Sequence, residues 1–288
     1  MKYAVLGAEG QLGRDLCPRL PGEVVRLTRA DADLTKPDTL AAAVRRLEPD
    51  VVVNCAAYNF VDRAETEVQA AFAVNAWGAG DLARVCQDQR CRLVHFSTDY
   101  VFGHDETRER PWDEADAPGP VSMYGLSKLT GEHLIRMHCP QSLIVRTCGL
   151  YGVGGSGGKG GNFVETMLRL AAAGKPLRVV NDQFCTPTYT VDLADAVVEL
   201  LALKRTGLYH VTNSGYCSWY EFARAIFELS MIDADRTPIA SREYNAPARR
   251  PRYSVLSGVG IDRIGLKPLR HWREALGAYL SERRQKES

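Results

Sequence analysis

The chain is predicted to be an α/β protein built on a doubly wound parallel sheet, with a smaller domain in its C-terminal part. Short apolar runs alternate with helical patterns through the first half of the sequence, which is the order expected of βαβ units. The apolar runs are continuous, as in VVV at residues 51–53, and this is typical of strands covered on both faces. After about Leu150 the rhythm changes, so the rest of the chain is expected to form a different structure.

Five strands are expected in the first half of the chain, separated by helical patterns. The strands are expected in YAVLG, EVVRLT, DVVVNCAA, CRLVHFST and SLIVRT. The helices are expected in QLGRDLCPRL, in DTLAAAVRRL, from about Glu65 to Gln87, and from about Tyr124. Because strands and helices alternate at this spacing, the five strands should lie parallel in one sheet.

A glycine-rich segment separates the two halves of the chain. YGVGGSGGKGGN, residues 151–162, contains seven glycines in twelve residues, which is too many for a regular element. A flexible linker and a mobile loop over a ligand are both consistent with this composition.

Helical patterns dominate the C-terminal part. NFVETMLRLAAAG is expected to form a helix that ends at Gly174, TVDLADAVVELLAL another, and GLYHVT a late strand. In SWYEFARAIFEL, Ser218 should cap the helix and Glu221 should complete a capping box. The segments ARRPRYSVL and HWREALGAYL follow. The expected domains are residues 1–148 plus 189–212, and residues 149–188 plus 213–288.

Composition and charge restrict the class of protein. The 288 residues are 45% hydrophobic and 25% charged, as in a soluble globular protein. The net charge of +1 arises from 36 basic and 35 acidic residues and suggests no nucleic-acid or membrane partner. The sequence shows neither the apolar core of a signal peptide nor an apolar run of about 18 residues that could span a membrane. A cytoplasmic protein is therefore expected.

The cysteines follow no metal-binding or redox pattern. There is no C-x-x-C motif, and Cys86 and Cys91, the closest pair, have no neighbouring motif that would complete a zinc site. A disulfide framework is not expected in a cytosolic chain of this size. Most of the cysteines should be small buried side chains, and no bound metal is expected.

A glycine loop follows the first expected strand. Gly7, Gly10 and Gly13 form a G-x-x-G-x-x-G pattern in GAEGQLG. Glycines at such a junction permit a tight turn, close approach of the backbone to a pyrophosphate, and close packing of helix on strand. The first N–H groups of the helix then face the phosphates. The loop therefore predicts a dinucleotide site in a Rossmann-like fold.

The end of the second expected strand bears on the choice of cofactor. An acidic residue there would bind the ribose 2′-OH of NAD and repel a 2′-phosphate. This chain has Thr28 and Arg29 at that place, and Arg29 could accept a 2′-phosphate, so NADPH is favoured and NADH remains an alternative. A solvated arginine with no such role is equally consistent. Asp33 and Leu34 lie where the adenine ring is expected.

Tyr124 and Lys128 are one helical turn apart in SMYGLSK, so the phenol and the ammonium should share a helix face. An ordinary surface pair is one reading of this spacing. The other is a proton donor and the lysine that lowers its pKa from about 10. Strand order favours the second, because Thr98 at the end of the fourth strand and Tyr124 should meet at the carboxyl edge of the sheet.

Together these motifs resemble those of the extended short-chain dehydrogenases/reductases, and more narrowly of the dTDP-4-dehydrorhamnose reductase family. The similarity covers nearly the whole chain. Its most specific motifs are QFCTPTY, CSWYEFA and PARRP, beside GAEGQLGRDL, NFVDRAE, STDYVF and YGLSK. The resemblance implies reduction of the 4-keto group of dTDP-4-dehydro-β-L-rhamnose, a nucleotide sugar, in dTDP-rhamnose biosynthesis for cell-surface polysaccharide.

The resemblance also assigns residues. Thr98, Tyr124 and Lys128 would be catalytic, with Tyr124 the proton donor and Lys128 also a ribose ligand. The cofactor would be lined by Gly7, Gly10, Gln11, Leu12, Gly13, Thr28, Arg29, Asp33, Leu34, Ala56, Ala57, Tyr58, Asn59, Tyr124 and Lys128. The substrate would be bound by Thr98, Asp99, Gly149, Asn162 and Arg249. Asp99 could instead cap a turn, Asn59 could be an ordinary loop residue, and Arg249 could lie on a solvated surface.

One position departs from the family. Where the family usually reads R-T-S-W-V-Y-G, with a tryptophan against the substrate, this chain reads RTCGLYG with Gly149. Either the glycine loop closes over the sugar or the subsite is wider, which leaves a reductase of another dTDP-4-keto-deoxysugar as an alternative. A non-catalytic NADP-binding regulatory subunit is a further alternative. The resemblance to this family leaves a homodimer and a Mg²⁺ ion as alternatives, although no sequence feature indicates either.

Overall fold

A six-stranded parallel sheet forms the centre of the protein. The computed structural model describes residues 1–154 and 161–287. The strands are β1 (Lys2–Leu6), β2 (Glu23–Leu27), β3 (Val51–Asn54), β4 (Arg92–Thr98), β5 (Leu143–Thr147) and β10 (Gly207–His210). They pair in the order β10-β5-β4-β3-β1-β2, and every pair is parallel. The doubly wound sheet expected from the sequence is confirmed.

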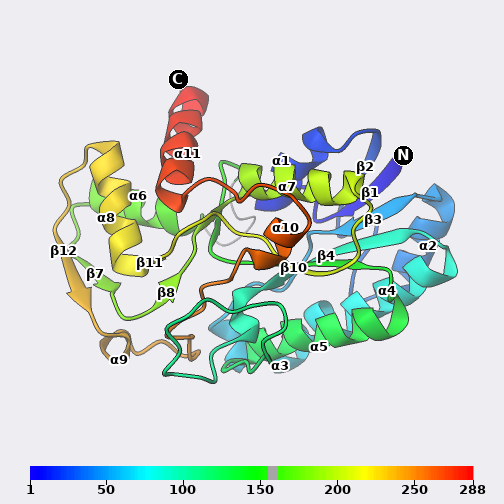
Figure 1. Ribbon diagram of the computed structural model, residues 1–288, viewed down its shortest axis with the longest axis horizontal. Coiled ribbons are helices and arrows are strands. Elements are labelled where there is room, and N and C mark those ends of the chain that lie inside the picture. Colours follow the sequence, from blue (N-terminus) through cyan, green and yellow to red (C-terminus); the bar gives the residue numbers. More distant parts are fainter. Residues whose placement is uncertain (155–160, 288) are drawn as a thin grey trace.

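Helices cover both faces of this sheet (Figure 1). Helices α1 (Gln11–Leu16) and α7 (Thr190–Ala202) lie on one face, and α2 (Pro37–Leu47), α4 (Ala79–Asp88) and α5 (Met123–His138) on the other. Side chains alternate along each strand, so Val51 and Val53 enter one core while Val52 enters the other. This explains the continuous apolar runs, because both faces of each strand are buried.

The helical stretch expected from Glu65 to Gln87 is broken into four pieces. A 3₁₀ turn at Arg63–Glu65 precedes α3 (Val68–Phe72), and a π-helical segment at Ala73–Gly78 joins α3 to α4. Close backbone approach accompanies the irregularity, since a Cβ on Gly78 would lie 2.2 Å from the carbonyl oxygen of Leu34. Helical periodicity does not reveal such a bulge, which commonly marks functional sites.

The C-terminal part packs around a second hydrophobic core, to one side of the sheet (Figure 1). It contains α6 (Phe163–Ala172), β7 (Leu177–Val180), α8 (Trp219–Ser230), β12 (Arg236–Ile239) and α11 (Trp272–Glu287). The capping box of Ser218 and Glu221 is confirmed. Gly174 follows the end of α6 with φ +63°, as expected of a glycine that ends a helix.

Several short elements were not expected from the sequence. The small sheets pair β6 (Leu150–Tyr151) with β9 (Thr188–Tyr189), β8 (Phe184–Cys185) with β11 (Cys217–Ser218), and β7 with β12. The 3₁₀ turns Cys17–Arg19 and Asp99–Val101 and the helices α9 (Ser241–Tyr244) and α10 (Val259–Arg263) are equally short. Elements of two to five residues show no hydrophobic period, so only the partner strand or the surrounding contacts define them.

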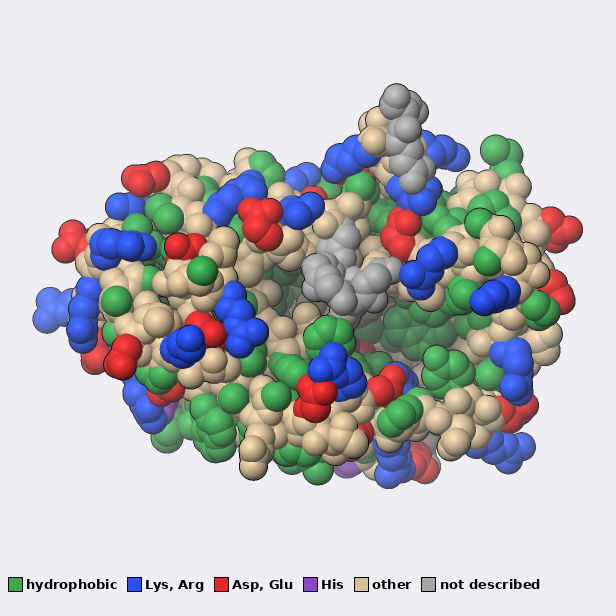
Figure 2. Space-filling model, turned by 180° about the vertical axis from the view of Figure 1, so that it is seen from behind, with side chains coloured by type: hydrophobic (Ala, Val, Ile, Leu, Met, Phe, Trp, Pro, Cys, Tyr) green, Lys and Arg blue, Asp and Glu red, His purple; other side chains and the backbone are tan. Residues whose placement is uncertain are grey.

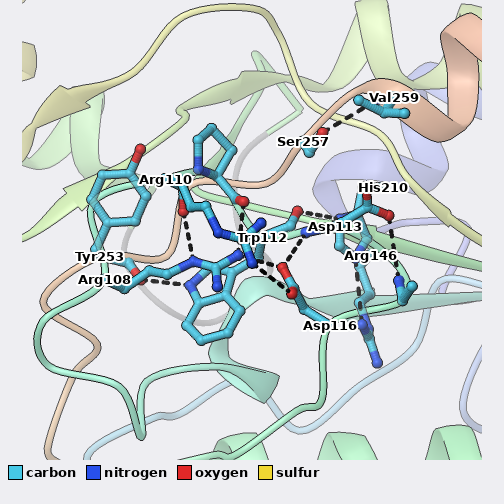
Figure 3. A network of polar contacts seen from close by, with 12 residues as sticks. Arg108, Arg110, Trp112, Asp113, Asp116, Arg146, His210, Tyr253, Ser257 and Val259 are labelled. Carbon is cyan, nitrogen blue, oxygen red and sulfur yellow. Dashed lines mark hydrogen bonds and ion pairs between the residues drawn. The ribbon is translucent and has the colours of Figure 1, made fainter.

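Trp112 holds the long segment between β4 and α5 against the edge of the sheet (Figure 3). Its ring stacks on Phe102 with centroids 4.5 Å apart, and its indole N–H donates to the carbonyl oxygen of Tyr253 at 2.9 Å. The guanidinium of Arg108 lies 4.0 Å from the other side of the ring. The carbonyl oxygen of Trp112 lies 3.0 Å from Nδ1 of His210 on β10, so the edge strand is tied to this segment.

The surface and the thiols agree with the composition. Positive and negative side chains are interspersed over the face shown in Figure 2. All eight cysteines are free thiols, and all but Cys55 are buried, which confirms their expected packing role. None of the helices in the described ranges is both long enough and apolar enough to cross a membrane.

Candidate active site

The carboxyl ends of the parallel strands bring the expected site residues to one edge of the sheet. The chain passes from β1 outward to β2, then returns to the other side of β1 as β3. Strand order therefore reverses between β1 and β3, where ligands bind in open α/β sheets. The glycine loop follows β1, and the loop beginning at Cys55 follows β3. The end of β4, at Thr98, is two strands from the loop after β1.

The glycines after β1 allow close backbone approach. Gly7 has φ +69°, and a Cβ there would lie 2.8 Å from the amide nitrogen of Ala56. A Cβ on Gly13 would lie 2.5 Å from the carbonyl oxygen of Gly7, which shows how closely α1 packs on the turn. Both positions exclude larger side chains. The loop thus has the shape that brings backbone close to a dinucleotide phosphate.

Asn75, from the π-helical segment, fixes the loop after β3. Its side chain accepts from the amide of Tyr58 and donates to the carbonyl oxygen of Tyr58, both at 2.9 Å. It also lies 3.0 Å from the hydroxyl of Ser127, next to Lys128 on α5. Asn75 was missed from the sequence because its partners lie 17 and 52 residues away. It connects the expected cofactor loop to α5.

The residues after β2 are already paired with each other. The Thr28 hydroxyl and amide both donate to the carboxylate of Asp31, at 2.7 and 2.9 Å. The guanidinium of Arg29 pairs with Asp33 at 3.0 Å, although the Arg29 side chain is 80% exposed. Two acids therefore lie beside the positions that were expected to accept a 2′-phosphate. The carboxylate of Asp33 also accepts from Thr35, and the side chain is mostly buried.

Thr98 and Tyr124 meet, as expected, and the Thr98 side chain lies close enough to lower the pKa of the Tyr124 phenol. Ser122 begins α5, with its hydroxyl accepting from the amide of Gly125. The Thr98 hydroxyl also accepts from the amide of Tyr100 at 3.2 Å, and the rings of Tyr100 and Tyr124 lie 5.8 Å apart, edge to face. The end of β4, through Thr98, and the 3₁₀ turn after it, through Tyr100, therefore hold the Tyr124 phenol in place.

The pKa of Tyr124 differs from the expectation. Burial raises the pKa of Tyr124 above that of free tyrosine, with the charge of Asp99 acting in the same direction and the hydrogen bond to Thr98 opposing it. Lys128 does not offset this, because its Nζ atom points elsewhere and donates to the carbonyl oxygen of Phe96 at 2.7 Å. Burial lowers the pKa of Lys128 to about 8, against the opposing charge of Glu132. In the protein alone, the phenol is thus held protonated, as a proton donor requires.

Asp99 faces the interior instead of an open site. It is 3% exposed and accepts from the hydroxyl of Thr98 and the thiol of Cys148, both at 3.1 Å, and from Ser254. Burial raises the pKa of Asp99 above its usual range, and these three hydrogen bonds oppose the shift. The turn after β4 is capped by Thr98 and not by Asp99. Asp99 therefore fixes the position of the Thr98 side chain from the protein interior.

The motifs NFVDRAE and PARRP meet in space. Glu65 accepts from the amide of Met123 at 2.9 Å, so it holds the first turn of α5. Asp62 receives two hydrogen bonds of 2.9 Å from the guanidinium of Arg250, and it also accepts from the amide of Ala248. The Arg250 side chain is 19% exposed. Arg250 therefore lies in the mostly buried position and pairs with the loop after β3.

Arg249, the arginine singled out from the sequence, has a different environment. Its side chain is 63% exposed and pairs with Glu106. It lines a cavity of about 460 Å³ with three further arginines, and Glu106 and Asp182 are the acids of that cavity. The four are Arg242, Arg249, Arg250 and Arg252. A second cavity, of about 310 Å³, lies next to β10 around Val211 and Leu256.

Asn162 caps α6, and most of the hydrogen bonds that its side chain can form are made within the protein. Its amide oxygen accepts from the amide of Glu165 at 3.1 Å. Its amide nitrogen donates to the carbonyl oxygen of Gly152 at 3.2 Å and lies 3.3 Å from Oε1 of Gln11. The structure therefore places Asn162 beside the expected cofactor loop, and the cap explains why an asparagine stands before this helix.

Trp219 occupies the space beside Gly149. Gly149 has φ +54°, and a Cβ there would lie 3.5 Å from Cη2 of Trp219 and 3.3 Å from Cα of Pro187. The indole packs on Phe163, with ring centroids 4.7 Å apart. A large side chain at position 149 would meet both Trp219 and Pro187. The expected closure of the glycine loop concerns residues 152–161, of which 155–160 lie outside the described residues.

The residues present fit a nicotinamide dinucleotide. The glycine turn offers backbone where any Cβ would collide. The hydroxyl of Thr147, at the end of β5 opposite Thr98, is buried and has no hydrogen-bond partner among the described residues. An unpaired buried hydroxyl at this edge suits a polar ligand group. Within the described ranges, no cluster of three His, Cys, Asp or Glu side chains is placed to hold a metal ion.

Family and sequence comparisons agree along the chain. The family model described as RmlD substrate binding domain matches residues 1–285. The spore coat polysaccharide biosynthesis protein SpsK of Bacillus subtilis is 45% identical, covering 98% of each chain. A dTDP-4-dehydrorhamnose reductase of Mycolicibacterium smegmatis is 42% identical over 96% of this chain and 84% of its own. A dTDP-4-keto-6-deoxy-D-glucose reductase of Streptomyces niveus is 41% identical, covering 96% of this chain and 95% of its own.

Solved structures agree with the fold and its family. The dTDP-4-dehydrorhamnose reductase of Clostridium acetobutylicum superposes with a TM-score of 0.92 at 39% identity, covering 98% of this chain and 99% of its own. The dTDP-4-dehydrorhamnose reductase of Bacillus anthracis, solved in complex with NADP, gives the same TM-score at 35% identity and the same coverage. The chain therefore belongs to the dTDP-4-dehydrorhamnose reductase family, within the extended short-chain dehydrogenases/reductases.

Proposed function

We propose that this protein reduces the 4-keto group of dTDP-4-dehydro-β-L-rhamnose to give dTDP-β-L-rhamnose, with Tyr124 as proton donor. The observation that carries the proposal is that the side chains of Thr98 and Tyr124 lie close together at the edge of the sheet where the glycine loop lies. Family membership supports a reductase acting on a dTDP-sugar, because the relatives in the comparison bear such names.

Each catalytic residue has one task in this proposal. A bound nicotinamide cofactor would supply the hydride. Tyr124, held protonated by burial, donates its proton to the oxygen that gains charge during reduction. In the protein alone the Thr98 hydroxyl donates to Asp99, and on substrate binding it would turn that proton to the same oxygen. Lys128 binds the cofactor ribose and restores the protonated state of the site after each turnover.

The cofactor residues of the proposal lie after β1, after β2 and after β3 of the Rossmann-like fold, and on α5. Gly7 to Gly13 would contact the pyrophosphate, and Ala56 to Asn59 follow β3 at the point where strand order reverses. Thr28, Arg29, Asp33 and Leu34 surround the adenosine. The exposed Arg29 is free to rotate from Asp33 towards a 2′-phosphate, since a solvated ion pair of this kind is worth under about 1 kcal/mol.

NADPH is expected to be used at least as well as NADH. Replacing Thr28 by Asp should move the preference towards NADH, because a second carboxylate beside Asp31 would repel the 2′-phosphate. The measurement is kcat/KM for both cofactors, with Thr28→Ser as the matched control that keeps the hydroxyl. A wild-type protein that uses NADH alone would contradict the assignment of Arg29.

The substrate is proposed to lie between Tyr124 and the arginine-lined cavity. Tyr100 connects the two, because its ring packs on Tyr124 and its hydroxyl lies in the field of Arg250. Four arginines against two acids give the cavity a positive charge that suits a nucleotide diphosphate. Arg249 is the proposed contact at the mouth. Asp99 and Asn162 would act on the sugar indirectly, since both side chains are occupied within the protein.

Trp219 is proposed to form the wall of the sugar subsite beside Gly149. Trp219→Ala should lower kcat/KM for the native sugar by about 10-fold, the effect of losing roughly 1.4 kcal/mol of aromatic contact. Gly149→Trp should be inactive and less stable, because the indole would meet Trp219 and Pro187. Steady-state kinetics with the dTDP-sugar check the Trp219→Ala prediction. Trp77→Ala is the control, since Trp77 is an exposed tryptophan in the π-helical segment before α4. Full activity of Trp219→Ala would remove this wall from the proposal.

One assay distinguishes the proposed function from two alternatives. A reductase of a different dTDP-4-keto-deoxysugar is favoured by Gly149 and by the dTDP-4-keto-6-deoxy-D-glucose reductase among the relatives. A non-catalytic regulatory subunit would keep the fold without turnover. The assay follows oxidation of NADPH and NADH by the purified protein across a panel of dTDP-4-keto sugars. Turnover of dTDP-4-dehydrorhamnose above all others supports the proposal, and no turnover with any sugar overturns it.

The two-domain division is also a proposal. Residues 1–148 plus 189–212 would bind the cofactor, and residues 149–188 plus 213–288 would bind the nucleotide sugar. The separate hydrophobic core around α6, α8 and α11 supports this division.

A further inference from the structure

A second buried titratable side chain contacts Lys128. His95 lies on β4 and is 1% exposed, and Lys128 on α5 is 2% exposed. Nζ of Lys128 lies 3.3 Å from Nε2 of His95 and 2.7 Å from the carbonyl oxygen of Phe96. Both side chains are thus cut off from water, and the position of each proton is decided by the protein atoms around them.

Asn54 fixes the tautomer of His95. The amide oxygen of Asn54 accepts from the backbone N–H of Ala56 at 3.1 Å, so its amide nitrogen is the atom that faces the ring. That nitrogen lies 3.1 Å from Nδ1 of His95. An amide nitrogen only donates, so Nδ1 must accept. A neutral imidazole carries one proton, which is therefore on Nε2.

The same proton faces Lys128. An ammonium has three donors and no acceptor, so an ammonium opposite an Nε2–H would bring two donors together. An uncharged amine fits, since its lone pair accepts from Nε2–H while one of its own N–H groups donates to Phe96. Burial likewise lowers the pKa of His95 well below its usual value, with the charge of Lys128 acting in the same direction, so a doubly protonated ring does not resolve the conflict.

We propose that Asn54 and His95 stabilise the uncharged amine of Lys128 in the cofactor-free protein at alkaline pH, and that binding of a nicotinamide cofactor there draws one proton from solvent onto that amine. The proton adds to the nitrogen lone pair, and nothing is oxidised or reduced. His95 is thus a positioning residue that acts through Lys128. The inference rests on the proposed function only in requiring that the protein binds a nicotinamide dinucleotide.

The other charged groups around Lys128 do not account for this arrangement. Glu132 and Tyr124 share α5 with it, and the charge of Glu132 favours the ammonium. Arg146 on β5 holds the Glu132 carboxylate in a bidentate pair, with distances of 2.7 and 2.8 Å, which limits that influence. On β3, the neighbouring residue is Asn54, which contacts His95 and does not titrate. His95 is therefore the group that decides which form of Lys128 is stabilised by a hydrogen bond.

The first test measures the protonation of Lys128 directly in the cofactor-free protein. NMR of protein labelled with ¹³C at lysine Cε follows each ammonium with pH, and Lys128→Met assigns the signal. A titration midpoint near pH 8 is expected for wild-type protein. His95→Gln, whose amide oxygen can accept from an ammonium, should raise the midpoint by about 1 unit, the effect of one net hydrogen bond. A wild-type midpoint near that of free lysine overturns the proposal.

The second test measures proton uptake on cofactor binding, without any sugar. Calorimetry with NADPH in buffers of different ionisation enthalpy should show uptake approaching one proton at pH 9 and none at pH 6.5. Asn54→Asp should reduce the uptake at pH 9, because a carboxylate accepts from Nδ1–H and moves the ring proton away from Nε2. His210→Gln is the matched control, since His210 is equally buried but contacts Trp112 and Arg146.

The outcomes separate this inference from the proposed function. Equal uptake at pH 6.5 and pH 9, or equal effects of the His95 and His210 variants, would overturn the role of His95 while leaving reductase activity untouched. Absence of turnover with every dTDP-4-keto sugar would overturn the function and leave the proton measurement valid, because that measurement needs only NADPH.

Discussion

Replacing Tyr124 by phenylalanine is expected to lower kcat by about 10²–10⁴-fold, the contribution of a positioned general acid. The phenol lies beside the Thr98 side chain, and burial raises the pKa of the phenol so that its proton is present at neutral pH. Phenylalanine keeps the ring and its edge-to-face contact with Tyr100, so the fold and the packing of α5 should remain. The measurement is kcat with the native ketosugar.

Binding of NADPH separates chemistry from structure in this experiment. The dissociation constant of NADPH should change little in Tyr124→Phe, because Lys128 and the glycine loop are untouched. Tyr3→Phe is the matched control, since Tyr3 is buried at the opposite end of β1 and its hydroxyl donates to the sulfur of Met1. Near-full turnover by Tyr124→Phe would show that the proton comes from another group.

The buried pair of Glu132 and Arg146 is expected to carry the largest stability effect. Both side chains are at most 1% exposed, and two hydrogen bonds of 2.7 and 2.8 Å join them. Glu132→Gln should lower the free energy of unfolding by about 3–5 kcal/mol, because the guanidinium of Arg146 would remain buried without its counter-charge. Chemical denaturation measures this. The double variant Glu132→Leu with Arg146→Met should recover much of the loss, because no lone charge is left.

This pair also predicts a pH dependence. Burial alone would raise the pKa of Glu132, but the hydrogen bond and charge of Arg146 outweigh it and lower the pKa below the usual 4.5. Its contribution to stability is therefore complete above about pH 4.5 and is lost as the pH falls through the lowered value. Glu228→Gln is the control, since Glu228 pairs with Arg273 at a solvated site and should cost under about 1 kcal/mol. Equal losses of unfolding free energy in Glu132→Gln and Glu228→Gln would contradict the role given to the buried pair.

The order of strands and helices was predictable because its signals are local. Residues 51–53 are apolar on both faces of β3, and the glycine loop directly follows β1, so each could be recognised within a few residues of sequence. The spacing of Tyr124 and Lys128 likewise follows from one helical turn. The π-helical segment was not predictable, because Gly78 is required by the carbonyl oxygen of Leu34, which is distant in the chain.

The sequence therefore determined the family, the sheet, the glycine loop and the residue types that meet at its edge. The tertiary structure alone decided how those residues are paired. Arg250, and not Arg249, lies in the mostly buried position because Asp62, 188 residues away, pairs with it. The Nζ atom of Lys128 turns towards Phe96 and His95 instead of Tyr124 for a similar reason. Hydrogen bonds and burial depend on atoms that folding brings together. The spacing of residues along the chain specifies only which face of a helix or strand carries a side chain.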